Sequence, residues 1–295
     1  MRLLLDETGA LPEAAGSTSL DQEALAALYA YPARDGGRAW VRANMVTSLD
    51  GAATGPDGRS GSINTGADRQ VFALLRALAD VIVVGAGTAR VERYRAPRAV
   101  RGERAVLREG RPAAPALVVV SRSANLPLLL AESAAGALDG SGQHGSGQEG
   151  TALGGNALHG SDRDGGQDGD QHGGGEQGEV FLVSCANAEP SALEASRLAL
   201  GEDHVILAGD DEVDLPAMVA ELAGRGLPRI LCEGGPHLLR DMAAAGLLDE
   251  LCLTVVPHLL AGEHTRILAG AGVEVDLAPK VLVEAEGALL GRWFA

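Results

Sequence analysis

The sequence predicts an α/β fold in which helices cover both faces of a mostly parallel sheet. Short runs such as 81–84 and 116–120 are dense in β-branched residues and apolar on both faces, as strands of buried parallel sheets are. These runs alternate with segments whose apolar residues recur at helical spacing, which is typical of parallel α/β sheets. Two final runs, 281–284 and 288–294, flank Gly287 and predict a C-terminal hairpin that adds antiparallel edge strands.

The segments follow in order from the N-terminus. Residues 1–38 contain one short helical pattern, Asp21 to Tyr29, and are expected to lead into a single domain over residues 39–295. A strand over 41–46 precedes a helix that Thr65 would cap, with Asp68 in the acidic place of a capping box. Further strands are predicted over 81–84, 116–120, 180–183, 205–207, 229–232 and 251–256, with helices from Asp214 to Gly224 and through Leu238, Leu239 and Met242 to Gly246.

A low-complexity insert interrupts this domain at about residues 136–178. Sixteen of its 43 residues are glycine, and it has too few aliphatic residues to offset the entropy of ordering, so a disordered surface loop is expected. Its histidines, His144, His159 and His172, are widely spaced on a flexible chain, and no metal site is expected there. The three cysteines, Cys185, Cys232 and Cys252, form no C-x-x-C motif and are expected to be buried free thiols.

Composition excludes several classes of function. The net charge of −16 argues against a nucleic-acid partner, because such proteins need basic surfaces. No apolar run approaches the roughly 18 residues of a membrane span, and the apolar patch in Met1–Asp6 is too short for a signal peptide. A cytoplasmic protein is expected. A phosphorylated small molecule remains compatible with the charge, since a few arginines or backbone N–H groups can hold one phosphate.

Two glycine turns follow predicted strands and could bind phosphate. In Val84–Arg90 the glycines Gly85 and Gly87 precede a helix start, where backbone N–H groups face an anion. Arg90 stands where a dinucleotide fingerprint has its third glycine, which argues against an ordinary Rossmann site. The turn at Glu233–Pro236 also places two glycines before a helix, which leaves backbone N–H groups free for an anion. A tight turn without a ligand is the structural alternative at both places.

Polar side chains at other strand ends complete the candidate site. Ser121 and Arg122 follow a buried strand and could clamp a 2′-phosphate, or lie in a solvated loop. Asn44 and Ser48 share one strand face with Val46 between them, and Asp50 follows in the turn, which suits a heterocycle that needs donors and acceptors over an apolar wall. The alternative is a turn in which Asp50 bonds local backbone.

Three stretches in order resemble the C-terminal reductase domain of the riboflavin-biosynthesis deaminase/reductase family, whose fold is similar to dihydrofolate reductase. They are N-M-V-T-S-L-D-G (44–51), L-R-A-L-A-D-V-I-V-V-G-A-G-T-A-R (75–90) and E-G-G-P-H-L-L (233–239), the last continuing to residue 257. The resemblance covers most of residues 41–260 apart from the insert. It implies that NADPH reduces 5-amino-6-(5-phosphoribosylamino)uracil to its ribitylamino form, by positioning and electrostatics rather than by a protein nucleophile.

The resemblance also implies roles for individual residues, and it implies a homodimer, for which the predicted hairpin would offer an edge. Asp50 and Glu233 would be catalytic, and no metal is expected. The cofactor would be held by Gly85, Gly87, Thr88, Ser121, Arg122, Gly234 and Gly235, and the substrate by Asn44, Ser48, Ser62, Arg76, Glu92 and Arg95.

Three departures from the family pattern leave the substrate open. The zinc deaminase half is absent, so a stand-alone reductase is expected. Many relatives have lysine at the position of Asn44 and a W-I-[ST] motif at residues 62–64, and an acidic segment becomes Val91–Arg95 here. Two alternatives therefore stay open. One is reduction of a pterin or folate, with Asp50 or Glu233 protonating or orienting the ring. The other is a non-catalytic protein that binds a nucleotide or flavin.

Overall fold

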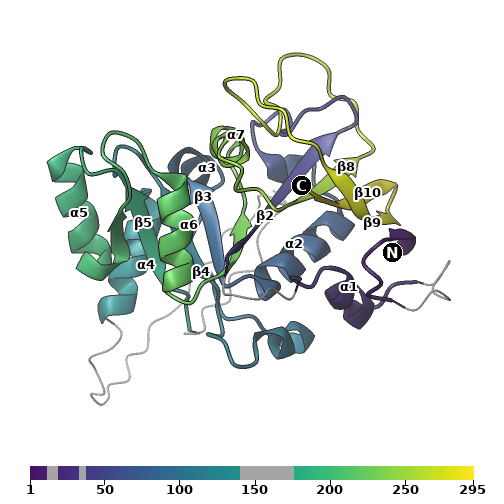
Figure 1. The fold of residues 1–295 in the computed structure, drawn as a ribbon, viewed down its shortest axis with the longest axis horizontal. Helices are drawn as coiled ribbons and strands as arrows, with labels where there is room; N and C mark the ends of the chain where they lie inside the picture. The colour runs from purple at the N-terminus through teal and green to yellow at the C-terminus, as the bar shows by residue number, and fades with distance from the viewer. Residues whose placement is uncertain (12–18, 33–37, 140–175) are drawn as a thin grey trace, which may run out of the picture.

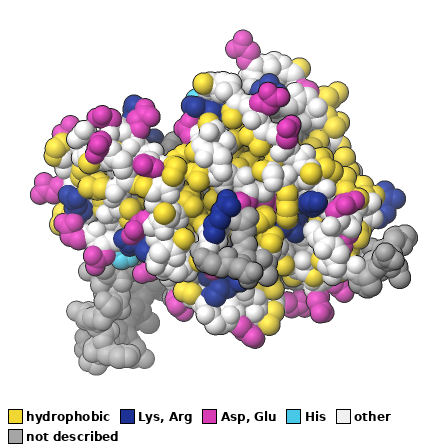
Figure 2. All heavy atoms as spheres, viewed as in Figure 1, with side chains coloured by type: hydrophobic (Ala, Val, Ile, Leu, Met, Phe, Trp, Pro, Cys, Tyr) yellow, Lys and Arg dark blue, Asp and Glu magenta, His cyan; other side chains and the backbone are white. Residues whose placement is uncertain are grey.

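One sheet organises the part of the chain that the structure describes. The computed structural model describes residues 1–11, 19–32, 38–139 and 176–295 (Figure 1). Within them, ten strands hydrogen-bond in the order β1-β9-β10-β8-β2-β7-β3-β4-β5-β6. Acidic side chains are spread over the face of the molecule shown in Figure 2, in keeping with the net charge of −16.

Seven neighbouring strands of the sheet run parallel, and this confirms the predicted fold class. In spatial order they are β8 (Glu250–Val256), β2 (Trp40–Ser48), β7 (Arg229–Cys232), β3 (Val81–Gly85), β4 (Ala116–Val120), β5 (Val180–Ser184) and β6 (Val205–Leu207). The predicted hairpin is also present, as β9 (Ala278–Ala285) and β10 (Ala288–Phe294), with β10 antiparallel to β8.

The sheet edge differs from the prediction. The hairpin was expected at the edge, but β1 (Arg2–Asp6) pairs antiparallel with β9 and covers it. Residues 1–38 therefore contribute more than a lead-in, because α1 (Gln22–Leu28) also buries Leu25 and Leu28 in the core. Asp21 caps α1 and accepts a hydrogen bond from the backbone N–H of Ala24. Periodicity did not reveal β1, since only three apolar residues mark it.

Helices cover both faces of the sheet. On one face α1, α2 (Gly66–Leu78), α3 (Ala86–Val91), α4 (Leu128–Asp139) and α5 (Pro190–Leu200) contribute to a single apolar cluster. On the other face the cluster contains residues of α6 (Leu215–Gly224) and α7 (Pro236–Ala244), and α6 crosses the front of the parallel strands in Figure 1. The sequence did not predict α4 or α5. Short 3-10 helices lie at Ser60–Ser62, Gly102–Arg108 and Glu202–His204.

The predicted insert is shorter than 136–178. Residues 136–139 belong to α4, and Gln177 forms an isolated bridge with Arg98. The remainder, 140–175, lies outside the described residues together with its three histidines. Across the described ranges no helix is both long and apolar enough to cross a membrane. The same ranges hold no group of three or more His, Cys, Asp or Glu side chains that could bind a metal. Cys185, Cys232 and Cys252 are buried free thiols.

A buried ion cluster joins the parallel and antiparallel halves of the sheet. Glu250 on β8 pairs with Arg42 of β2 at 2.9 Å and with Arg292 of β10 at 2.7 Å, and all three side chains are at most 2% exposed. Burial raises the pKa of Glu250, but the charges of Arg42 and Arg292 outweigh it and lower the pKa to about 2. Arg292 also donates to the backbone oxygens of Leu28, the last residue of α1, and of Ala30, two residues later. The cluster thus fixes α1 against three strands.

Replacing Glu250 with glutamine should destabilise the fold strongly. Glu250→Gln leaves two buried guanidinium groups without a counter-charge, which costs about 3–5 kcal/mol. Urea unfolding at pH 7 measures the loss. Because the folded pKa lies below the unfolded value of 4.5, the wild-type contribution is present above pH 4.5 and is lost as pH falls toward 2. Glu221→Gln, which breaks an exposed pair with Arg225, is the control and should cost less than about 1 kcal/mol. Equal losses in the two variants would contradict this account of the cluster.

Candidate active site

A large cleft lies across the carboxyl ends of the central parallel strands. It follows β3, β4 and β7 and reaches the middle of β2, and its volume is about 1970 Å³. Pockets for drug-sized ligands are roughly 300–1,000 Å³, so this cleft has room for more than one small molecule. Open α/β sheets bind ligands at this edge. Two regions of the cleft are distinguished below: a glycine end, formed by Gly85–Thr88 and Gly235–Leu238, and a β2 end around Asn44 and Val46.

Two glycine turns interlock at the glycine end. The Gly85 N–H donates to the Gly234 oxygen at 2.8 Å, and the Glu233 N–H donates to the Val83 oxygen at 2.9 Å. A Cβ added to Gly235 would lie against Thr88 Oγ1, so the Thr88 side chain would have to move to admit any other residue. Gly235 caps α7 without a side-chain hydrogen bond, which leaves N–H groups of the first turn free to meet an anion.

Glu233 is held by three hydrogen bonds at the boundary between the two regions. Its carboxylate accepts from Arg76 Nε and Nη2, both at 2.7 Å, and from the Tyr94 hydroxyl at 2.6 Å. The Glu233 side chain is 2% exposed, whereas Arg76 is 31% exposed and lines the cleft. Burial, with a further contribution from Glu233, raises the pKa of Tyr94. The arrangement makes Glu233 an anchor for Arg76, which also stacks on Phe72 with 4.3 Å between guanidinium carbon and ring centroid.

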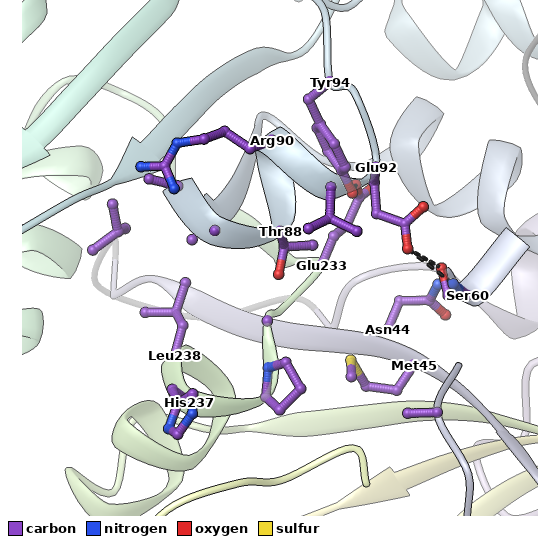
Figure 3. Close-up of a pocket in the computed structure, with 18 of the residues that line it drawn as sticks. Asn44, Met45, Ser60, Thr88, Arg90, Glu92, Tyr94, Glu233, His237 and Leu238 are labelled. Atoms are coloured by element: carbon purple, nitrogen blue, oxygen red, sulfur yellow. Dashed lines mark hydrogen bonds between the residues drawn. The ribbon is translucent and has the colours of Figure 1, made fainter. Parts of the chain in front are cut away.

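The β2 end gathers most of the residues that the sequence assigned to substrate. Asn44, Ser62, Arg76, Glu92 and Arg95 all line the cleft. Figure 3 shows Thr88 and Glu233 between Asn44 and Met45 on one side and Arg90 on the other. In the same view Glu92 accepts hydrogen bonds from the N–H and hydroxyl of Ser60, at 2.9 and 3.0 Å, so it fixes the 60–62 turn at the cleft wall.

Ser48 and Asp50 do not line this cleft. One Asp50 oxygen accepts from the Ser48 hydroxyl at 2.5 Å, and the other accepts from the backbone N–H groups of Leu260 and Ala261 at 3.0 and 2.8 Å. These bonds, led by the one from Ser48, lower the pKa of Asp50 to about 2. One carboxylate oxygen therefore holds the loop after β8 and the other holds the Ser48 hydroxyl. Asp50 is thus engaged within the protein, although its backbone partners are distant in sequence and not local as the structural alternative had them. Gly234 also does not line the cleft. A Cβ built on it would point to the sulfur of Met45.

The glycine end carries the expected anion-binding groups and some that the sequence did not assign. Gly85, Gly87, Thr88, Ser121, Arg122 and Gly235 line the cleft as expected. Arg90 also lines the cleft and extends into the same region (Figure 3). It had no binding role assigned from the sequence, because it was noted only for standing where a dinucleotide fingerprint has its third glycine. Tyr94 and Asp68 line the β2 end and were also missed. Tyr94 gave no signal, because its partner Glu233 is 139 residues away, and Asp68 was taken as a helix-capping residue.

Comparison with known proteins places most of the chain in one family alignment. The family model of the RibD C-terminal domain matches residues 39–149 and 173–285. Two curated proteins named 2,5-diamino-6-ribosylamino-4(3H)-pyrimidinone 5′-phosphate reductase match shorter stretches. The one from Methanothermobacter thermautotrophicus is 33% identical over 81 residues, 27% of this chain and 37% of that protein. The one from Aquifex aeolicus is 29% identical over 91 residues, 31% and 40% of the two chains. The matches span well under half the length of these relatives.

Solved structures show the same fold. A pyrimidine reductase-like protein from Corynebacterium diphtheriae superposes with a TM-score of 0.66 at 22% identity, over 87% of this chain and 91% of that one. The riboflavin biosynthesis reductase of Saccharomyces cerevisiae gives a TM-score of 0.53 at 14% identity, over 89% and 92% of the two chains. At these identities the likeness establishes the fold alone.

Replacing Asp50 with alanine should lower stability in a pH-dependent way. Asp50→Ala removes the bonds to Ser48 and to the loop at 260–261, so its melting temperature at pH 7 should fall below that of the wild type. The folded pKa is about 2 and the unfolded value 3.8, so the Asp50 contribution is present above pH 3.8 and fades as pH falls toward 2. The two melting curves should converge over that range in differential scanning calorimetry. Asp276→Ala, at an exposed position, is the control; a gap of constant size at every pH would contradict the assignment.

Proposed function

The chain belongs to the RibD C-terminal domain family, and from that membership we propose that it reduces a phosphorylated ribosylaminopyrimidine with NADPH, as a step of riboflavin biosynthesis. The observation that carries the proposal is the cleft itself: two interlocked glycine turns at one end and a polar β2 wall at the other, with Arg76 between them. The names of the two curated relatives support this reaction class.

The glycine end fits a dinucleotide phosphate. The absence of a side chain at Gly235 keeps the backbone accessible, and the uncapped start of α7 offers N–H donors to a pyrophosphate. Arg90 and Arg122 are exposed and line the cleft, and in this proposal they would meet a further phosphate such as the 2′-phosphate of NADPH. When bound, the cofactor would supply the hydride.

The β2 end fits the pyrimidine and its sugar phosphate. Reduction places a hydride on the sugar C1′ of a ring-opened imine and a proton on the attached nitrogen, so no protein nucleophile is required. The chain's contribution is to orient the substrate: Asn44 presents an amide from β2, and Arg76 is held in one direction by Glu233 and Tyr94. On this view Glu233 acts as a positioning residue through Arg76. The substrate would be the uracil compound expected from the sequence or the 2-amino compound named for the relatives.

An assay of NADPH binding and oxidation separates this proposal from the pterin or folate alternative and from the non-catalytic alternative. NADPH should bind and be oxidised by a phosphoribosylaminopyrimidine and not by dihydrofolate. Oxidation by dihydrofolate alone would favour the first alternative, and binding without turnover would favour the second. A homodimer and a cytoplasmic location stay predictions from the sequence. The hairpin edge that the sequence offered for pairing two copies is occupied by β1, so a dimer would have to use another surface.

A carboxylate at position 235 should abolish cofactor binding. Gly235→Asp adds a charged side chain against Thr88 Oγ1, which must shift to admit it, and the new charge opposes the pyrophosphate. We expect NADPH affinity, measured by fluorescence titration, to fall at least about 100-fold. Gly224→Asp, at the end of α6 where a Cβ meets open space, is the matched control and should bind NADPH like the wild type. An unchanged affinity in folded Gly235→Asp would reject the glycine end as the cofactor site.

Arg122 should distinguish NADPH from NADH. A guanidinium beside a phosphate contributes roughly 1.5–3 kcal/mol, so Arg122→Ala should raise the KM for NADPH about 10- to 150-fold. NADH lacks the 2′-phosphate, and its KM should change less than about twofold. Arg101→Ala, exposed and outside the cleft lining, serves as the control. Equal changes for the two cofactors would place the 2′-phosphate elsewhere.

A further inference from the structure

Asp68 is a buried carboxyl on the wall of the cleft that helix capping does not explain. It lies in the first turn of α2 and is 4% exposed. The sequence suggested a capping box, and half of one is present, since the Thr65 hydroxyl accepts from the Asp68 N–H at 3.1 Å. The carboxyl itself, however, meets the hydroxyl of Thr254 on β8 instead of completing the box.

Two other acidic side chains of the cleft wall have their donors within the protein, and Asp68 keeps spare acceptor capacity. Glu233 is satisfied by Arg76 and Tyr94, and Glu92 by Ser60. For Asp68, the donors are neutral: the Thr254 hydroxyl and the Asn64 amide, whose nitrogen, when turned toward the Ser60 oxygen, lies 3.3 Å from Asp68 Oδ2.

A carboxylate has about four lone-pair sites, and burying one without donors costs free energy. Burial raises the pKa of Asp68, while the Thr254 bond and the charge of Arg69 oppose that rise. The start of α2 also favours the charged form. An ionised group in this position therefore needs donors from whatever occupies the cleft.

The surroundings favour a flat heterocycle as that occupant. Val46 of β2 pairs in register with Thr254, so the Asp68 carboxyl lies beside the apolar part of the β2 wall. Val46 and Phe72 also line the cleft. An apolar floor with one acceptor group at its rim is suited to a planar ring that presents N–H groups along one edge.

We infer that Asp68 binds the pyrimidine edge remote from the sugar and selects a 2-aminopyrimidin-4(3H)-one over the corresponding uracil. This inference rests on the proposed function. A carboxylate offers two acceptors, and the 2-aminopyrimidinone offers two adjacent donors, ring N3–H and the 2-amino group. The uracil edge carries N3–H between two carbonyl oxygens, and one of these would face a carboxylate oxygen and be repelled. Such a mismatch excludes a competing substrate more effectively than lost contacts do.

The test compares kcat/KM for the 2-amino and the 2-oxo phosphoribosyl substrates in wild type and in Asp68→Asn. The wild type should prefer the 2-amino compound. Asparagine presents one acceptor and one donor, which matches the N3–H and carbonyl of uracil, so the preference ratio should fall by about 10- to 150-fold. Asp241→Asn, a cleft acid paired with Arg240 at 2.8 Å, is the control and should keep the wild-type ratio. Equal losses on both substrates in Asp68→Asn, or a wild-type preference for uracil, would overturn the inference.

A binding measurement separates this inference from the proposed reaction. Calorimetry with the free bases 2,5,6-triaminopyrimidin-4-one and 5,6-diaminouracil needs no turnover. The triamino base should bind the wild type more tightly, and Asp68→Asn should lose that difference. If the wild type turns over neither substrate but shows this pattern, the proposed reaction fails and the inference stands; equal or absent binding of the bases overturns the inference.

Should Asp68→Asn fail to fold, Thr254→Val gives a second route to the same readout. Valine has the shape of threonine but lacks the hydroxyl that orients the Asp68 carboxyl, so the preference for the triamino base should shrink severalfold. An unchanged preference in Thr254→Val would count against Asp68 as the group that reads the base.

Discussion

The buried contact between Glu250 and two arginines is the constraint on which the rest of the structure depends. β8 runs parallel to β2 and antiparallel to β10, so it is the strand where the two kinds of sheet meet. Glu250 starts that strand, and Arg42 and Arg292 reach it from either side. Losing this contact would leave buried guanidinium charge without a counter-charge, so the cluster favours the observed register of the three strands. That register carries Asn44 and Val46 to the cleft wall and the buried Thr254 to its contact with Asp68.

The site is built by pairing rather than by single residues. Each glycine turn closes on the other, Arg76 is directed by Glu233 and Tyr94, and Asp68 is directed by Thr254 from a strand nearly 190 residues later. Groups fixed in this way lose little further freedom when a ligand arrives, which is what a reaction that depends on orientation requires.

The sequence was sufficient for the parallel strands and insufficient for side-chain partners. Runs such as 81–84 and 116–120 are recognised because a short, continuous apolar run rich in β-branched residues is typical of a strand buried on both faces. The glycine turns were found for a similar reason, since two glycines after a buried strand are rarely accidental. Tyr94 and Asp68 were missed because their roles depend on Glu233 and Thr254, which are distant in sequence. Asp50 was assigned to the site from its place after β2, but it does not line the cleft, and its carboxylate bonds Ser48 and the backbone of residues 260 and 261.

The strand β1 has a consequence for how the chain matures. A chain made from its N-terminus exposes β1 and the end of α1 long before their partners exist, since Arg292 lies 264 residues after the Leu28 oxygen it binds. Contacts of such separation form late and slowly. During synthesis the residues of β1 and α1 therefore stay without these partners until the C-terminal strands have been made. The pairing of β1 with β9 is thus among the last contacts that a growing chain can form.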